Sequence, residues 1–81
     1  MPRPGITPGD QDRFLGLLRK LRAERGLRQE DLARLLGRSQ SYVSKYEMGE
    51  IQLGFLEVRR ICQAIGISFE GFVRRFERQA R

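Results

Sequence analysis

The side chains best suited to chemistry lie on the outward face of one short predicted helix, over residues 40–47: Gln40, Ser41, Ser44 and Lys45. The apolar residues Val43 and Tyr46 are three positions apart and share the opposite face of that helix. Amide, hydroxyl and ammonium groups at a helix tip supply the donors and acceptors that read base edges in a DNA major groove. A glutamine can pair with the N6 and N7 edge of adenine, and a lysine with guanine O6 and N7. The pattern therefore predicts a DNA recognition helix.

A second short helix must precede this one and hold it in place. Residues 29–36 have an apolar set at helical spacing, which consists of Leu32, Leu35 and Leu36. Gly37 falls where this helix must end, at a position that favours a left-handed backbone. Ser39 follows as a hydroxyl N-cap for the recognition helix. Two short helices joined by a tight glycine turn predict a helix-turn-helix.

Three further amphipathic segments complete the predicted fold. The first helix runs from about Pro8, with Thr7 as its N-cap, to about Arg25. Its expected buried residues are Phe14, Leu17, Leu18 and Leu21. After a loop over residues 50–54, a helix over residues 55–65 is expected to bury Phe55, Val58, Ile61, Cys62 and Ile65. The last helix, over residues 69–78, contains the apolar residues Phe69, Phe72, Val73 and Phe76.

The sequence therefore predicts an all-α fold, a compact five-helix bundle with a central helix-turn-helix. Residues 1–9 contain all three prolines and are expected to form a flexible N-terminal arm. Residues 10–78 are expected to form the domain, and residues 79–81 a C-terminal tail. A chain of 81 residues supports one domain with a single modest core.

The charge balance narrows the choice of partners. Sixteen basic residues, of which fourteen are arginine, oppose ten acidic residues and give a net charge of +6. Arginine pairs with phosphates through a planar fork, so the charge favours nucleic acid, although a merely solvated surface has a similar composition. No apolar run approaches the length of a membrane span, and no leader resembles a signal peptide. A cytoplasmic location without a membrane partner is expected.

Catalysis is the function class that the composition disfavours most. The chain has no histidine, which excludes an imidazole base, a Ser-His-Asp triad and a histidine metal site. The single cysteine, Cys62, excludes a disulfide within the chain and a cysteine zinc cluster, and we expect it to be a small buried hydrophobe. The glycines stand singly as helix stops and form no phosphate-binding loop. We therefore expect no enzymatic activity, no cofactor and no metal.

Three segments, in order and at matching spacing, carry a resemblance to a known family. They are L-x-Q-E-x-L-A at residues 27–33, S-Q-S-x-V-S-x-x-E-x-G at residues 39–49, and A-I-G-I-S at residues 64–68. Over about residues 14–76 the chain resembles the lambdoid-repressor and Cro-like (XRE-type) helix-turn-helix domains. The resemblance implies a lambda repressor-like fold, double-stranded DNA as the partner, and a bacterial or phage-derived protein associated with the nucleoid.

The resemblance also implies roles for individual residues. Base contacts are assigned to Gln40, Ser41 and Lys45, with Ser44 at the margin of the set. The expected DNA-backbone contacts are Arg28, Gln29, Arg38, Ser39 and Tyr42. Gln29 matches a position that also braces the first recognition glutamine, whereas Tyr42 either donates to a phosphate or covers the core edge. Arg22 and Glu47 match a pair that forms an ion pair between helices in the phage repressors.

Arg28 departs from the family pattern, because a small capping residue usually precedes the glutamine that opens the helix. Loss of that cap is expected to cost about 1 kcal/mol of helix stability. In return, the substitution places a cation beside the expected DNA backbone. We therefore favour a phosphate contact over a plain solvated charge for Arg28, and also for Arg38 in the turn.

The leading function is a sequence-specific transcriptional regulator that binds a palindromic operator as a homodimer. A single domain of this kind touches few base pairs, so dimerisation is the usual route to specificity. The expected dimer interface consists of Leu56, Val73 and Phe76, on the premise that the bundle leaves an apolar stripe uncovered there. The alternative is an antitoxin that binds a protein toxin and represses its own operon, in which case that stripe serves the toxin.

Overall fold

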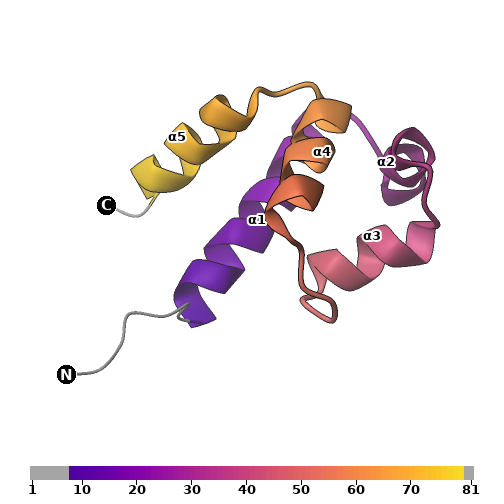
Figure 1. Cartoon of the computed structure of the whole chain (residues 1–81), viewed down its shortest axis with the longest axis horizontal. Coiled ribbons are helices and arrows are strands. Elements are labelled where there is room, and N and C mark those ends of the chain that lie inside the picture. The colour runs from indigo at the N-terminus through magenta and orange to yellow at the C-terminus, as the bar shows by residue number, and fades with distance from the viewer. Residues whose placement is uncertain (1–7, 80–81) are drawn as a thin grey trace.

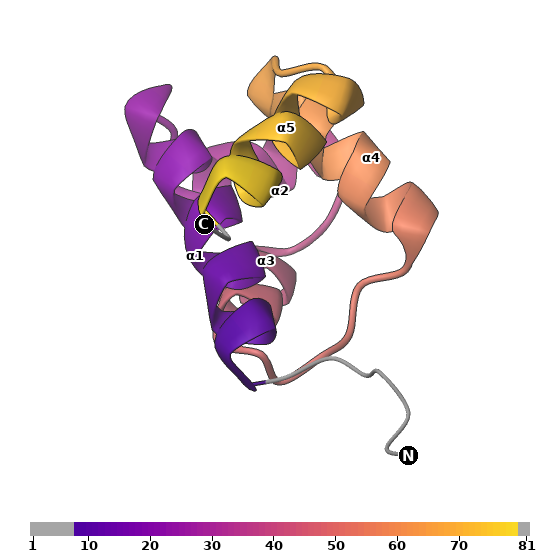
Figure 2. The ribbon, with the colours of Figure 1, turned by 90° about the vertical axis from the view of Figure 1, so that its left-hand side faces the viewer.

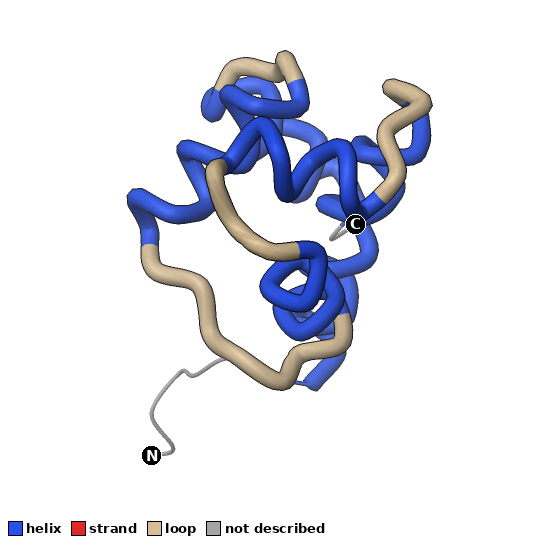
Figure 3. Tube along the Cα trace, turned by 90° about the vertical axis from the view of Figure 1, so that its right-hand side faces the viewer, coloured by secondary structure: helices blue, strands red, loops and turns tan. Residues whose placement is uncertain are grey.

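Helices joined by short loops make up residues 8–79, the part of the chain that the computed structural model describes (Figure 1). These helices are α1 (Pro8–Glu24), α2 (Gln29–Leu36), α3 (Gln40–Glu47), α4 (Phe55–Ile65) and α5 (Phe69–Gln79). The all-α class and the element order are as predicted, and this part of the chain contains helix and loop without a strand (Figure 3). The helix bounds also agree, with a difference of one residue at the end of α1 and of α5.

The outer helices extend slightly past the predicted domain edges. Pro8 and Gly9, which the sequence assigned to the arm, are the first residues of α1. Proline suits the first helical position because its missing N–H would have no partner there. Gln79, assigned to the tail, is the last residue of α5. Residues 1–7, including the expected cap Thr7, and residues 80–81 lie outside the described part of the chain.

Helix α1 packs against α3, α4 and α5, and α2 packs against α3 and α4. Figure 1 shows α4 crossing α1, with α2 and α3 together on one side and α5 on the other. Helix α5 packs on both α1 and α4, and Figure 2 shows it lying beside α4. The largest fully buried side chains come from the first four helices: Leu17, Leu18, Leu32, Val43, Tyr46, Ile61 and Cys62. Helix α5 adds Phe72, which meets Phe14 of α1 edge to face at 6.1 Å between ring centroids.

The boundaries of the helix-turn-helix follow from local backbone chemistry. Gly37 ends α2 in a left-handed conformation with φ of 67°, which side chains other than glycine adopt at a cost. The Ser39 hydroxyl oxygen then accepts a hydrogen bond from the backbone N–H of Tyr42 at 3.3 Å and caps α3. At the start of α2, the carboxylate of Asp31 accepts the backbone N–H of Arg28 at 2.9 Å. Helix α2 is thus capped from within, and the expected capping loss at Arg28 is offset.

Two apolar residues that the sequence placed in the core are exposed. Leu35 is 60% exposed because the buried face of α2 is formed by Leu32, Ala33 and Leu36. With about 100° between successive helical residues, Leu35 projects beyond the edge of that face. Phe55 is 70% exposed because it is the first residue of α4, and the core covers only the turns that follow it. Its ring only meets the edge of the Phe69 ring, at 5.0 Å between centroids.

Candidate nucleic-acid interface

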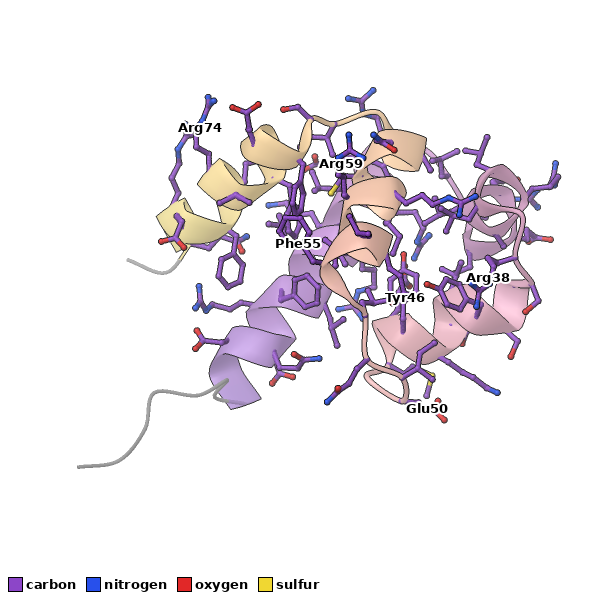
Figure 4. The ribbon with its side chains drawn as sticks, viewed as in Figure 1. Arg38, Tyr46, Glu50, Phe55, Arg59 and Arg74 are labelled. Atoms are coloured by element: carbon purple, nitrogen blue, oxygen red, sulfur yellow. The ribbon has the colours of Figure 1, made fainter. Side chains whose placement is uncertain are left out.

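Helix α3 presents the predicted reading side chains on one face and anchors itself by the other. Val43 and Tyr46 are fully buried, and Figure 4 shows Tyr46 between α3 and α4. Gln40, Ser41 and Lys45 are exposed on the outer face. Ser44 is half-buried, and its hydroxyl lies 3.7 Å from the sulfur of Met48. The three exposed residues are therefore accessible to a ligand, and Ser44 is the least accessible of the four, in keeping with its marginal place in the predicted set.

A continuous chain of hydrogen bonds joins the tip of α3 to the protein interior. The side-chain Nε2 of Gln40 donates to Oε1 of Gln29 at 2.7 Å. Gln29 in turn donates from its Nε2 to Oε1 of Glu47 at 2.9 Å. The structure thus places Gln29, the first residue of α2, between the exposed amide of Gln40 and a buried carboxylate at the end of α3.

Arg22 and Glu47 lie together, as the resemblance implied. Arg22 donates from Nε to Oε2 of Glu47 at 2.7 Å and from Nη2 to Oε1 at 3.0 Å. A third donor, Nη1, bonds the carbonyl oxygen of Leu27 at 2.8 Å in the loop between α1 and α2. Glu47 is only 7% exposed, so the bidentate pair supplies the charge and hydrogen bonds that a buried carboxylate requires.

Acidic neighbours already engage Arg28, which the sequence assigned to the DNA backbone. Its Nε lies 3.1 Å from Oδ2 of Asp31, and its Nη1 lies 3.5 Å from Oε1 of Glu30. The side-chain and backbone hydrogen bonds from Arg28 lower the pKa of Asp31 to about 2. Any phosphate near Arg28 therefore competes with two carboxylates for the same exposed cation.

Arg38 and Tyr42 form a stacked pair at the start of α3. The Arg38 guanidinium lies 3.9 Å from the centroid of the Tyr42 ring, and Figure 4 shows Arg38 beside the start of that helix. The Tyr42 hydroxyl donates to Oε2 of Glu57 on α4 at 3.3 Å. Partial burial, followed by the charge of Glu57, raises the pKa of Tyr42. The half-buried Tyr42 packs against the core, with its hydroxyl on a carboxylate, and so favours the second of the two roles expected for it.

Known proteins of one family share this fold and this sequence pattern. Residues 18–72 match the family described as Helix-turn-helix. The structure also matches an XRE-family like protein from Pseudomonas syringae pv. tomato str. DC3000 with a TM-score of 0.83 and 33% sequence identity, over 90% of this chain and 89% of that chain. The chain belongs to the XRE-type helix-turn-helix family. This XRE-type domain is accordingly a DNA-binding domain that functions in the regulation of transcription. No curated protein matches the sequence significantly.

The helix-capping roles of two carboxylates in the XRE-type domain were not predicted from the sequence. Asp31 caps α2, and Glu57 accepts the backbone N–H of Gly54 at 2.7 Å and caps α4 in the same way. An acidic residue three positions after the N-cap is a recognisable signal, because its carboxylate reaches back to the free N–H groups of the first turn. The bond from Tyr42 to Glu57 spans separate helices and has no such local signal.

The three residues of the expected dimer interface differ in accessibility. Leu56 is 71% exposed and Val73 is 44% exposed. Phe76, which we expected the bundle to leave uncovered, is partly buried against the core, with the Arg13 guanidinium 4.6 Å from its ring centroid. Beside Val73 and Phe76 lies an open groove of about 660 Å³ between α1, the loop before α4 and α5. Its apolar lining is formed by Phe14, Leu53, Phe72, Val73 and Phe76.

The described residues show no sign of a membrane or metal site. None of the helices between residues 8 and 79 has the length and apolar character needed to cross a bilayer. The same residues contain no group of three or more His, Cys, Asp or Glu side chains placed to hold a metal ion. Cys62 is fully buried in the core, as expected, and this burial raises the pKa of its thiol to about 11.

Proposed function

We propose that this domain binds a two-fold symmetric operator as a homodimer, with α3 in the major groove, and thereby regulates transcription. Gln40 carries the proposal, because its exposed amide stands at the tip of α3 and is held by Gln29 at 2.7 Å. A side chain that is ordered before binding loses less conformational freedom on the DNA. Its amide has the donor and acceptor that match the N6 and N7 edge of adenine.

Within this proposal the other residues contact either the bases or the DNA backbone. Ser41, Ser44 and Lys45 complete the base-reading face. The backbone contacts are assigned to Arg28, Gln29, Arg38 and Ser39, whereas Tyr42 is assigned to the core edge, where its hydroxyl donates to Glu57. Arg38 is the strongest of these, since its guanidinium stacks on the Tyr42 ring, whereas Arg28 is held by Asp31 and Glu30. Ser39 accepts the bond that caps α3, which leaves its hydroxyl proton available to a phosphate oxygen.

The proposed dimer contact uses the exposed side of α4 and α5. Leu56 and Val73 are large apolar residues that water reaches, and Val73 borders the groove beside Phe76. Burial of such residues against a second copy removes apolar area from water twice in a two-fold contact. The groove gives that contact a concave surface.

Selection of bound sequences from a random duplex pool tests the proposal directly. A palindromic consensus is expected, with half-sites about one helical turn apart. Gln40→Ala should lose discrimination at one base position of each half-site, at a cost of about 1–3 kcal/mol on the preferred site and little on random DNA. Equal losses on both kinds of DNA would contradict a base-reading role for Gln40.

The second candidate function is an antitoxin that binds a protein toxin and represses its own operon. The exposed Phe55, Leu56 and Val73 favour it, because a large apolar surface outside the DNA-reading helix also fits a different protein. The two candidates differ in oligomeric state and partner. Purification of the tagged chain with its neighbouring gene product would support the antitoxin if a stoichiometric complex formed, and a stable homodimer alone would oppose it.

A further inference from the structure

Glu47 is joined to the exposed face of α3 by hydrogen bonds through Gln29, which its ion pair with Arg22 does not require. The carboxylate is almost fully buried and already has two hydrogen bonds from Arg22. It nevertheless accepts a third, from Nε2 of Gln29, and Gln29 accepts from Gln40. The four side chains form one relay that runs from α1 through α3 and α2 to the tip of α3.

The carboxylate fixes the direction of every bond in this relay. An ionised carboxylate only accepts hydrogen bonds, so the amide of Gln29 must turn its NH₂ group to Glu47. The carbonyl oxygen of Gln29 then faces Gln40 and can only accept, so Gln40 must turn its own NH₂ group inward. With either amide reversed, two acceptor oxygens would face each other.

The outer end of the relay is consequently polarised. Gln40 keeps its Oε1 acceptor and its second N–H donor for an external partner, in a defined arrangement. Adenine offers an N6 donor and an N7 acceptor in the major groove, which an amide meets only when its oxygen and nitrogen lie in the matching order. Arg22 holds the inner end in place, because its third donor is bound to the carbonyl oxygen of Leu27.

We propose that Glu47 is a positioning residue for base recognition: through Gln29 it sets the orientation of the Gln40 amide, and with it the base preference at the position that Gln40 reads. This inference rests on the proposed DNA-reading function. It extends the recognition machinery to a buried residue that no base can touch.

Glu47→Gln is the decisive substitution. The new amide can donate to Gln29 as well as accept from it, so the relay loses its imposed direction while side-chain size is preserved. The affinity of the protein is measured for the selected operator, for three duplexes that differ from it only at the position defined by Gln40→Ala, and for random DNA. Glu50→Gln is the matched control, since Glu50 is exposed in the loop after α3 and its substitution changes the net charge equally (Figure 4).

The preference of the wild type for one base at that position should fall about tenfold in Glu47→Gln, a change that corresponds to about 1.4 kcal/mol. Binding to random DNA should match that of Glu50→Gln. In a Gln29→Ala background, Glu47→Gln should cause no further loss of preference. Glu47→Asp, which keeps the charge for Arg22 but withdraws the carboxylate from Gln29, should lose the preference too, and it serves if Glu47→Gln does not fold.

Two results would overturn the inference. A variant that is folded by circular dichroism and binds all four duplexes more weakly by the same factor would show that Glu47 only stabilises the domain. An additive loss in the Gln29→Ala background would show that the effect does not pass through Gln29. A wild-type protein with no base preference at any position would instead refute the proposed function itself, so the two failures are distinguishable.

Discussion

Arg22 of α1 and Glu47 of α3 are 25 residues apart in sequence and meet in a bidentate ion pair, with hydrogen bonds of 2.7 and 3.0 Å. The Arg22 side chain is 13% exposed and the Glu47 side chain 3%, so the pair joins the two helices largely out of water. Helix α3 is therefore oriented by a charged contact as well as by Val43 and Tyr46 in the core. The same carboxylate supports Gln29, which links domain stability to the geometry of the reading face.

Removal of one partner of this pair should be costly. Glu47→Ala leaves a buried guanidinium unpaired and is expected to lower the free energy of unfolding by about 3 kcal/mol. Denaturant melts of Arg22→Ala, Glu47→Ala and the double variant measure the coupling, and additive losses would show that the residues do not interact. The pair of Arg75 and Glu24 is the control, because it is largely open to solvent, with 3.3 Å between Nη1 and Oε1. Its coupling should be less than about 1 kcal/mol.

DNA binding should depend strongly on salt. If each subunit neutralises three or four phosphates, the slope of log affinity against log salt concentration for a dimer is expected to be about −6. Arg38→Ala should flatten this slope and weaken binding to all sequences alike. Arg28→Ala should flatten it less, because Asp31 and Glu30 already share that cation. Titrations at several salt concentrations measure both slopes, and an affinity independent of salt would remove the backbone assignment of these arginines.

The cap of α2 should make stability depend on pH in the acid range. The hydrogen bonds from Arg28 lower the pKa of Asp31 from its ordinary 3.8 to about 2. The ionised form is thus favoured in the folded state, so its contribution is complete above about pH 4 and is lost as the pH falls towards 2. The difference in stability between wild type and Asp31→Asn should narrow over that interval. A difference that stays constant from pH 6 to 2 would exclude ionised Asp31 as its source.

A charge at the proposed dimer contact should separate the subunits. Val73→Asp is preferred to a change at Phe76, since Val73 is exposed whereas Phe76 packs against the core. The variant should keep its helical content but sediment as a monomer and lose tight operator binding. Leu35→Asp is the control, because Leu35 is exposed on α2, away from α5, and its substitution should leave the dimer intact. A wild-type protein that is monomeric at a concentration of about tens of micromolar, above the Kd of a dimer with ordinary micromolar affinity, would disprove this interface.

The sequence by itself determined the helices and their limits, because these depend on neighbours along the chain. Gly37 ends α2 by its positive φ, Ser39 caps α3 through the next turn, and apolar spacing identifies most of the buried face of each helix. The resemblance to a family supplied the long-range pair of Arg22 and Glu47, which no local pattern could indicate. The exposure of the polar face of α3 was likewise predictable, since a polar face opposite Val43 and Tyr46 must point outward.

Tertiary structure alone decided which parts of those faces are covered and which polar groups of separate helices become partners. Phe55 has the periodicity of a core residue, yet it is the first residue of α4 and lies beyond the reach of the core, whereas Phe76 near the end of α5 packs against the core. Tyr42 and Gln29 look like free polar side chains in sequence, but the fold places Glu57 beside the first and Glu47 beside the second. Periodicity defines a direction around one helix axis. Burial and hydrogen bonding depend on how the other helices are arranged around it, which only the packed structure supplies.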